Sequence, residues 1–197
     1  MDTNSAELNV FLQTHLPCDK NLEGLPGGRT KEGVSRFGRL LASYITLDEH
    51  RYGKISVIVS STLPRAVETA ELCFRKSNVP IRQDERLCPV DYGLHEERPM
   101  SEILKLQANH VMEPFPQGES YQDMADRYLG VLNDLIREYP GERVLLIGHG
   151  ESRTVLMHHC QGIPLAEALD QSKSQRQVAS NPVEHYSAFE GPFLYRV

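Results

Sequence analysis

The chain has no tryptophan, only four cysteines among 197 residues, and no long hydrophobic run. Its longest apolar runs, such as residues 144–147, fall far short of the roughly 20 residues that a membrane-spanning helix needs. The first ten residues have neither the basic cluster nor the apolar core of a secretory signal. These absences argue against a membrane-embedded or secreted protein, and we expect a cytoplasmic one.

The few cysteines are also far apart. None of them forms a Cys-x-x-C pair, which makes a disulfide framework or a zinc site improbable and is typical of a reducing compartment. They are Cys18, Cys73, Cys88 and Cys160. We therefore expect no structural metal.

Positive charge is in deficit as well. The chain has 21 lysines and arginines against 27 acidic residues, for a net charge of -6. This balance gives no electrostatic reason to bind nucleic acid or an anionic membrane, although it permits a local cationic pocket. The hydrophobic share of 40% and the charged share of 24% are those of a folded protein. The length predicts one domain, residues 1–197.

Strand-like apolar runs alternate with helical patterns along the chain. The runs at 7–13, 55–61 and 143–148 are rich in the residues of strands buried on both faces. The intervening segments 30–45, 62–74, 118–139 and 149–162 have helical periodicity. We therefore predict an α/β fold, a three-layer sandwich with a mostly parallel central sheet and helices on both faces.

Three smaller expectations concern the boundaries of these elements. Ser61 or Thr62 is expected to cap the second helix, with Pro64 in its first turn. Ser120 and Asp123 have the spacing of a capping box, and Gly162 has the position of a helix end. Residues 171–182 look too polar to be ordered. The segments 185–189 and 192–197 look like final strands at a sheet edge.

Residues 77–119 do not fit the alternating pattern. Five prolines interrupt them, and a short helix is expected near 101–108. The prolines are Pro80, Pro89, Pro99, Pro114 and Pro116. We interpret this segment as an inserted, cap-like excursion over the active-site end of the sheet.

Polar residues stand where the three central strands are expected to end. His15 ends the first strand, Arg65 lies one turn into the helix after the second, and His149 ends the third. The carboxyl ends of parallel strands meet at one edge of a sheet, where helix N-termini favour anions. Arg65 adds a planar donor fork suited to phosphate. We expect the two histidines to lie within about 10 Å, because both must reach one phosphoryl group.

Several segments in this order resemble the histidine phosphatase superfamily, and within it the phosphoglycerate-mutase-like branch. They are His15 followed by Asn21, then "SSTLPRAVETA", "RLCPVDYG", "QGES" and "LLIGHGESR". The resemblance covers roughly residues 8–160. It implies the corresponding fold and phosphoryl transfer through a phosphohistidine.

The resemblance also assigns roles to individual residues. His15 would be the nucleophile, and His149 would stabilise the charge of the phosphoryl group. Asn21, Arg65 and backbone N–H groups such as that of Gly150 would hold the phosphoryl oxygens. A carboxylic acid would protonate the leaving oxygen and then activate water. The resemblance implies no metal and no other cofactor.

Three positions depart from the family pattern. Thr14 replaces an arginine that clamps the phosphoryl oxygens, Leu16 replaces a glycine, and Pro89 stands at the usual place of the catalytic glutamate. Each charge-assisted hydrogen bond contributes on the order of 1.5–3 kcal/mol, so the phosphate clamp is expected to be weakened. Proline cannot transfer a proton.

Other residues could replace the missing groups. Asp91 is favoured as the acid, because it lies two residues from Pro89 and would point to the same face of an extended segment. The other candidate acids are His95, Glu96, Glu97 and Glu151, and the candidate cations are Arg29 and Arg153.

Three functions agree with these residues. The first is a phosphomonoesterase acting on a small phosphorylated or anionic molecule. The second is a repurposed enzyme that uses the same histidine pair for acid–base or acyl chemistry on a less charged substrate. The third is a pseudoenzyme that retains the scaffold as a binding module. A mutase is disfavoured, because phosphoryl shuttling needs the full clamp. No nucleic-acid or membrane partner is expected, and the oligomeric state is left open.

Overall fold

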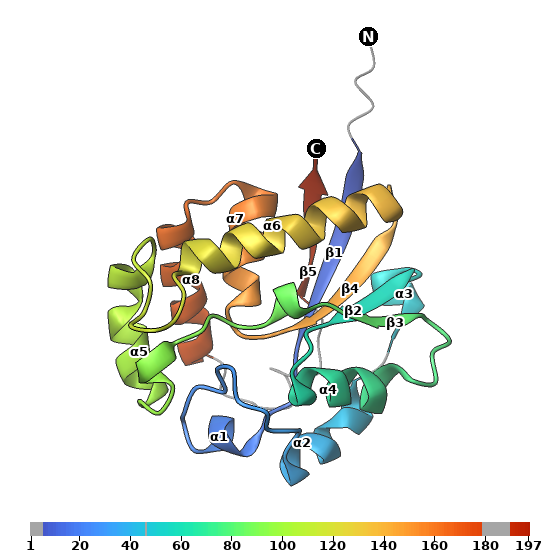
Figure 1. The fold of residues 1–197 in the computed structure, drawn as a ribbon. Helices are drawn as coiled ribbons and strands as arrows, with labels where there is room; N and C mark the ends of the chain where they lie inside the picture. Colours follow the sequence, from blue (N-terminus) through green and yellow to red (C-terminus); the bar gives the residue numbers. More distant parts are fainter. Residues whose placement is uncertain (1–5, 46, 179–189) are drawn as a thin grey trace.

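The structure is a computed structural model that describes residues 6–45, 47–178 and 190–197. Its centre is a five-stranded sheet with the order β3-β2-β4-β1-β5 (Figure 1). The strands are β1 (Glu7–Thr14), β2 (Val57–Ser60), β3 (Ile81–Gln83), β4 (Arg143–Gly148) and β5 (Glu190–Arg196). All neighbours pair in parallel except β1 and β5, so the predicted mostly parallel sheet is confirmed.

The register of the three central strands brings their carboxyl ends to one edge. Thr14 of β1 is paired with Gly148 of β4, and Ser60 of β2 is paired with Ile147 of β4. The residues that follow these strands therefore begin at the same level of the sheet. This alignment places the segments after β1, β2 and β4 side by side.

Alternate strand residues face two separate hydrophobic cores. Val10 and Leu12 of β1 belong to the core under α6 (Tyr121–Glu138), α7 (Ser152–Gln161) and α8 (Leu165–Val178). Phe11 belongs to the core on the other face, under α2 (Arg36–Leu41) and α4 (Pro64–Phe74). Figure 1 shows these two groups of helices on opposite sides of the sheet. The predicted three layers are thus confirmed.

The predicted N-cap is confirmed for α6 but not for α4. Ser120 caps α6 by accepting from the Asp123 N–H, and the predicted capping box is present. The N-cap of α4 is Leu63, so the expectation of Ser61 or Thr62 was wrong. Pro64 begins α4 because its fixed φ suits the first helical position. Ser61 instead directs its hydroxyl to His149.

The structure differs from the predictions for the segments 30–45 and 171–182. The helix expected over 30–45 is only α2 and a short 3-10 helix η1 (Ala42–Tyr44), since Ser35 caps α2. Residues 171–178 are helical rather than loose, because α8 packs at Leu165 and Leu169 and the stretch 171–178 contains neither glycine nor proline. Residues 179–182 and 185–189 lie outside the described residues. The edge strand expected over 192–197 is confirmed as β5.

The segment 77–119 contains short elements. They are β3, η2 (Glu85–Leu87), η3 (Gly93–His95), α5 (Met100–Leu106) and η4 (Gln107–His110). The helix expected near 101–108 is confirmed, and the cap-like role of the segment stays a prediction. The remaining helices of the described residues are α1 (Asp19–Leu22) and α3 (Glu49–Tyr52). Among the described residues, no helix combines the length and the apolar character that crossing a membrane requires.

Candidate active site

His15 and His149 lie together at the carboxyl edge of the sheet. His15 directly follows β1, and its backbone N–H donates to the carbonyl of Gly148 at 3.0 Å. The centroids of the two rings are 5.0 Å apart, which confirms the expected proximity. Both side chains are almost fully covered, with 6% and 2% exposure. The pair therefore stands in a desolvated environment.

The contacts of His15 fix the position of its proton. Nδ1 lies 2.7 Å from the carbonyl oxygen of Leu16, which can only accept a hydrogen bond, so Nδ1 is the protonated nitrogen. Nε2 then has the lone pair and accepts from Nε of Arg65 at 3.2 Å. A neutral imidazole with a lone pair at a fixed position is the nucleophilic form of histidine.

Arg65 lies between the two histidines and is only 1% exposed. Besides His15, its guanidinium donates to the carbonyls of Gly28 at 2.6 Å and Thr30 at 3.1 Å. Nη2 also lies 3.4 Å from Nδ1 of His149. Burial lowers the pKa of Arg65, yet an arginine keeps its charge in proteins. The site therefore has a buried cation whose donors face both rings.

His149 is held in the complementary tautomer. Because its Nδ1 faces a donor of Arg65, Nε2 has the proton and donates to Oγ of Ser61 at 2.8 Å. Burial lowers the pKa of His149 well below its usual value, and the positive charge of Arg65 acts in the same direction. The ring of His149 is therefore neutral near pH 7.

The backbone at Gly27 and Gly28 lies against the guanidinium group of Arg65. A Cβ atom on Gly27 would lie 3.0 Å from Cζ of Arg65. Gly28 has a φ of +41°, and a Cβ there would overlap the carboxyl group of Glu96. Glu96 in turn accepts from the backbone N–H groups of Arg29 and Tyr92. Close approach of this segment to Arg65 thus requires glycine.

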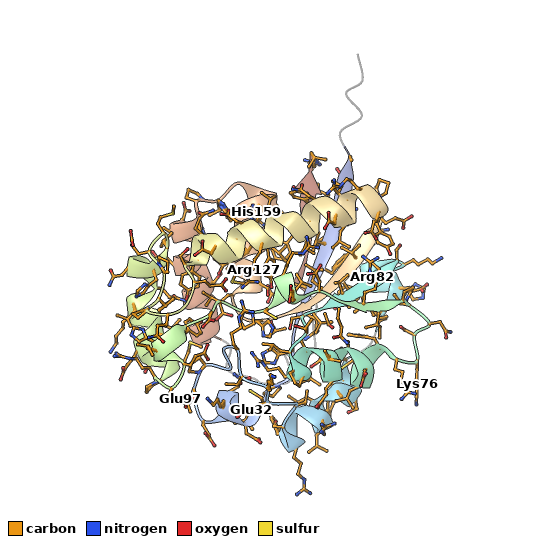
Figure 2. The ribbon with its side chains drawn as sticks, viewed as in Figure 1. Glu32, Lys76, Arg82, Glu97, Arg127 and His159 are labelled. Carbon is orange, nitrogen blue, oxygen red and sulfur yellow. The ribbon has the colours of Figure 1, made fainter. Side chains whose placement is uncertain are left out.

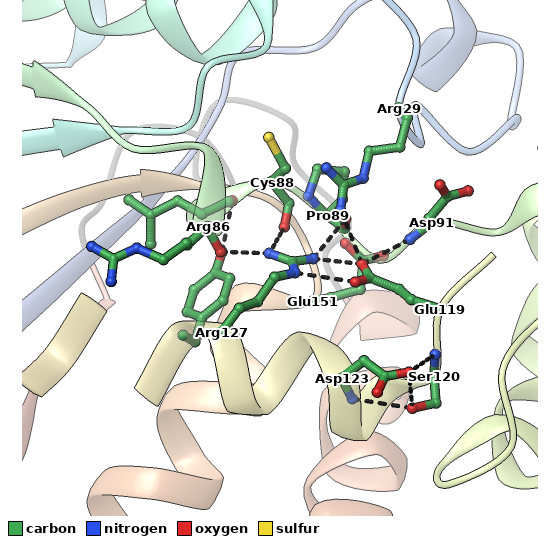
Figure 3. A network of polar contacts seen from close by, with 12 residues as sticks. Arg29, Arg86, Cys88, Pro89, Asp91, Glu119, Ser120, Asp123, Arg127 and Glu151 are labelled. Carbon is green, nitrogen blue, oxygen red and sulfur yellow. Dashed lines mark hydrogen bonds and ion pairs between the residues drawn. The ribbon is translucent and has the colours of Figure 1, made fainter. Parts of the chain in front are cut away.

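A second arginine ties the segment around Pro89 to helix α6 (Figure 3). Arg127 donates to the carbonyls of Cys88 at 2.7 Å and of Pro89 at 2.9 Å, and it pairs with Glu119 at 2.6 Å. Glu119 also pairs with Arg29 at 3.1 Å. This network fixes the backbone of the segment in which the family's catalytic acid would lie.

The candidate acids lie in different surroundings. Asp91 caps a turn, because its Oδ1 accepts from the N–H of Gly93 at 2.8 Å. Glu97 is exposed and forms an ion pair with Lys20 of α1. Figure 2 labels Glu97 close to this helix. The His95 ring packs against Phe115. Glu151 is buried and accepts from the hydroxyl of Tyr92 at 2.8 Å.

The expected phosphate-binding residues are spread around the histidines. Thr14 is half-buried at the end of β1, and Gly150 is half-buried between His149 and α7. Asn21 completes the capping box of α1, whose N-cap is Cys18, because its Oδ1 accepts from the Cys18 N–H at 3.2 Å. The roles of Thr14, Asn21 and Gly150 toward phosphate stay predictions. Of the two candidate cations, Arg29 pairs with Glu119, and Arg153 pairs with Glu190.

Sequence reasoning missed several residues that build the site. Thr69 donates to the carbonyl of Arg65 at 2.6 Å and accepts from the Leu16 N–H at 2.9 Å, which links α4 to the nucleophile's strand end. Thr69 and Glu119 lie inside motifs that were recognised, so their position was a usable signal. Nothing in the spacing of Arg127 distinguishes it from an arginine on a helix surface.

The fold and the site together define an α/β protein with two histidines and a buried arginine at the carboxyl edge of its sheet. In the part of the chain that the structure describes, no cluster of three histidine, cysteine or acidic residues could hold a metal ion. A sequence profile of the histidine phosphatase superfamily (branch 1) matches residues 17–183. The chain belongs to the histidine phosphatase superfamily.

Curated relatives agree with this assignment. The "probable phosphoglycerate mutase GpmB" of Cronobacter sakazakii is 27% identical over 165 residues, which cover 80% of this chain and 76% of the relative. The "uncharacterized phosphatase PhoE" of Bacillus subtilis is 30% identical over 153 residues, which cover 78% and 77%. The family's members are phosphatases or mutases, so the chain is an enzyme of the histidine phosphatase type.

Solved structures show the same fold. YhfR of Bacillus stearothermophilus is 27% identical, with a TM-score of 0.67 and coverage of 82% of this chain and 83% of that one. A mycobacterial glucosyl-3-phosphoglycerate phosphatase is 22% identical, with a TM-score of 0.68 and coverage of 85% and 84%. At this lower identity the likeness concerns the fold alone.

Proposed function

We propose that the protein is a phosphomonoesterase that acts on a small molecule through a phosphohistidine at His15, with a weakened phosphate clamp. The observation that carries the proposal is the state of the His15 ring. Its Nδ1–H donates to the Leu16 carbonyl, and its Nε2 lone pair faces the Arg65 guanidinium. A nucleophile and an oxyanion-binding cation thus stand at hydrogen-bond distance from each other.

In the first step, the lone pair of His15 Nε2 forms a bond to phosphorus as the ester P–O bond breaks. The Nδ1–H bond to Leu16 disperses the positive charge that develops on the ring. Arg65, whose fork now contacts both histidines, would transfer its donors to the phosphoryl oxygens. A carboxylic acid of the site would protonate the leaving oxygen in this step. In the second step water attacks phosphorus and gives a proton to the resulting carboxylate, the N–P bond breaks and inorganic phosphate leaves.

His149 would respond to the bound anion. Without a bound anion, burial and nearby positive charge keep its ring neutral. A phosphoryl dianion beside Nδ1 reverses part of that balance and favours the imidazolium. His149 would then donate to a phosphoryl oxygen through Nδ1, while Nε2 stays bonded to Ser61.

The clamp is weak because few cations are available to the anion. Thr14 offers a hydroxyl in place of a guanidinium, and both Arg29 and Arg127 are paired with Glu119. The substrate class rests on the curated relatives, of which one is named a probable phosphoglycerate mutase and another an uncharacterized phosphatase. We therefore favour hydrolysis of a small phosphate ester over phosphoryl shuttling.

The alternative of acid–base chemistry on a less charged substrate rests on the same Thr14 and on Pro89, which removes the usual acid. The two proposals differ in what His15 does. In the first it forms a bond to phosphorus, and in the second it moves a proton.

The test is hydrolysis of a panel of small phosphate esters by the wild-type chain and by His15→Ala. We expect the variant to lose about a thousandfold or more in kcat/KM, since it lacks the nucleophile. His50→Ala is the matched control, because His50 is exposed on α3 away from the sheet edge, and it should keep full activity. Undiminished hydrolysis by a folded His15→Ala would refute the proposal.

A further inference from the structure

Leu16 follows the nucleophile directly, at the position where the family resemblance predicts a glycine. Its peptide groups are held on two sides: the N–H donates to Oγ1 of Thr69 at 2.9 Å, and the carbonyl accepts from Nδ1 of His15 at 2.7 Å. We propose that Thr69 and Leu16 are positioning residues, which hold the His15 ring so that its Nε2 is aimed at the phosphorus of the substrate. This inference rests on the proposed phosphatase function and deepens it.

Thr69, Leu16, His15 and Arg65 form a closed circuit of four hydrogen bonds. The Thr69 hydroxyl donates to the carbonyl of Arg65 at 2.6 Å and accepts from the Leu16 N–H. The Leu16 carbonyl accepts from Nδ1 of His15, and Nε2 of His15 accepts from Nε of Arg65 at 3.2 Å. Through this circuit, helix α4 holds both nitrogens of the nucleophile.

The direction of each bond in the circuit follows from its chemistry. A threonine hydroxyl has one proton, and the Arg65 carbonyl can only accept it, so the Thr69 oxygen offers a lone pair to the Leu16 N–H. The opposite tautomer of His15 would place an N–H against the donor of Arg65 and a lone pair against the Leu16 carbonyl. The circuit therefore permits only the tautomer whose lone pair is at Nε2.

The side chain of Leu16 anchors the same peptide. It is fully buried in the core under α2 and α4, to which Phe11 and Ala66 also belong. A glycine has no side chain to bury and leaves the backbone more freedom. Leucine in place of glycine therefore gives the circuit a hydrophobic anchor beside the nucleophile.

The aim of the nucleophile is important because the reaction rate depends steeply on it. A displacement of about 1 Å in a reacting group costs on the order of a hundredfold in rate. Thr14 offers no charge to draw the phosphoryl group toward Nε2 of His15. A rigidly held ring keeps the reacting atoms aligned without a further cation.

The first test removes the hydroxyl of Thr69 and keeps the shape of the side chain. In Thr69→Val we expect kcat/KM for an aryl phosphate to fall roughly ten- to hundredfold, with the loss in kcat rather than in KM. The Nδ1 proton of His15, followed by NMR, should exchange with solvent about tenfold faster or more, since the ring is held less firmly. Thr69→Ser keeps the hydroxyl and should restore both properties.

Thr154→Val is the matched control, because Thr154 is also a buried threonine whose hydroxyl donates to a buried group, Oγ of Ser172, at 2.9 Å. It should lower the free energy of unfolding to a similar extent and leave kcat/KM and the Nδ1 proton unchanged. Equal losses of activity in Thr69→Val and Thr154→Val would show general destabilisation and overturn the proposal. Full activity in a folded Thr69→Val, or lost activity without faster exchange, would overturn it as well.

The anchor is tested by Leu16→Ala beside Leu41→Ala. Both changes open a cavity in the same core, but only Leu16 belongs to the hydrogen-bond circuit. We expect kcat to fall in Leu16→Ala and to stay at the wild-type value in Leu41→Ala, with thermal unfolding as the check on folding. The same kcat in both variants would refute the role of Leu16.

A measurement on the wild-type chain decides the case in which these variants do not fold. If the circuit opens as a unit, the Leu16 amide proton and the Nδ1 proton of His15 should have protection factors within about tenfold of each other. An unprotected Nδ1 proton beside a protected Leu16 amide would refute the proposal. This measurement needs no substrate, so it still tests the positioning role if the wild-type chain hydrolyses no phosphate ester, a result that would refute the proposed function.

Discussion

Thr14 offers a hydroxyl at the position where the family resemblance predicts the guanidinium of an arginine. Thr14 ends β1 directly before His15 and is half-buried. The remaining buried cation, Arg65, already distributes its donors over two rings and two carbonyls. A phosphoryl dianion would therefore have fewer charged donors than the family pattern provides.

Restoring the missing cation gives a prediction at this scale. Thr14→Arg should raise kcat/KM for an aryl phosphate by about tenfold or more, the worth of one charge-assisted hydrogen bond. Thr14→Gln is the matched control, because it adds length and donors without charge, and it should give a much smaller gain. No gain in a folded Thr14→Arg would contradict the weakened clamp.

At the scale of elements, a segment after α1 covers the site by docking on the segment 92–100. The Met100 N–H donates to the carbonyl of Gly24 at 2.9 Å, and the Arg29 N–H donates to Glu96 at 3.2 Å. Lys20 and Glu97 add an exposed ion pair. Between these contacts, Gly28 presents its carbonyl to Arg65.

The close packing at Gly28 predicts a specific cost of adding one methyl group. Gly24→Ala should lower the free energy of unfolding by roughly 1–2 kcal/mol, because Gly24 has a φ of +77°, which strains a residue with a side chain. The added Cβ would meet no atom within 4 Å, so this cost contains no steric clash. Gly28→Ala should cost more, by roughly a further 1–3 kcal/mol, since its Cβ would overlap the carboxyl group of Glu96. Denaturant unfolding measures both values.

A double mutant separates the clash from backbone strain. Gly28→Ala with Glu96→Ala should cost less than the sum of the two single changes, because removal of the carboxyl group frees the space. Only Gly28→Ala should also lower kcat/KM, since its carbonyl orients Arg65. Equal costs for Gly24→Ala and Gly28→Ala would be inconsistent with the described packing.

At the scale of the whole molecule, the fold and the two histidines could be predicted from the sequence. The three buried runs have strand composition, and a parallel sheet brings their carboxyl ends to one edge. Because His15 and His149 directly follow two of these runs, their approach to 5.0 Å follows from topology alone.

Other parts of the site depend on packing between distant segments. Arg127 reaches carbonyls about 40 positions earlier in the chain, and Gly28 meets Glu96 across the site. Helical periodicity cannot show which partner a side chain on α6 will contact. The prediction that Ser61 caps α4 was wrong for the same reason. The hydroxyl of Ser61 contacts His149, which is 88 residues away in the sequence.

The central claim is that His15 becomes phosphorylated, and trapping the intermediate tests it most directly. The wild-type chain is mixed with a radiolabelled phosphate ester, quenched in alkali because phosphohistidine is acid-labile, and digested for peptide mapping. The account predicts label on Nε2 of His15, none in His15→Ala, and formation at least as fast as turnover. Steady hydrolysis without any phosphoenzyme, or label on a residue other than His15, would contradict it.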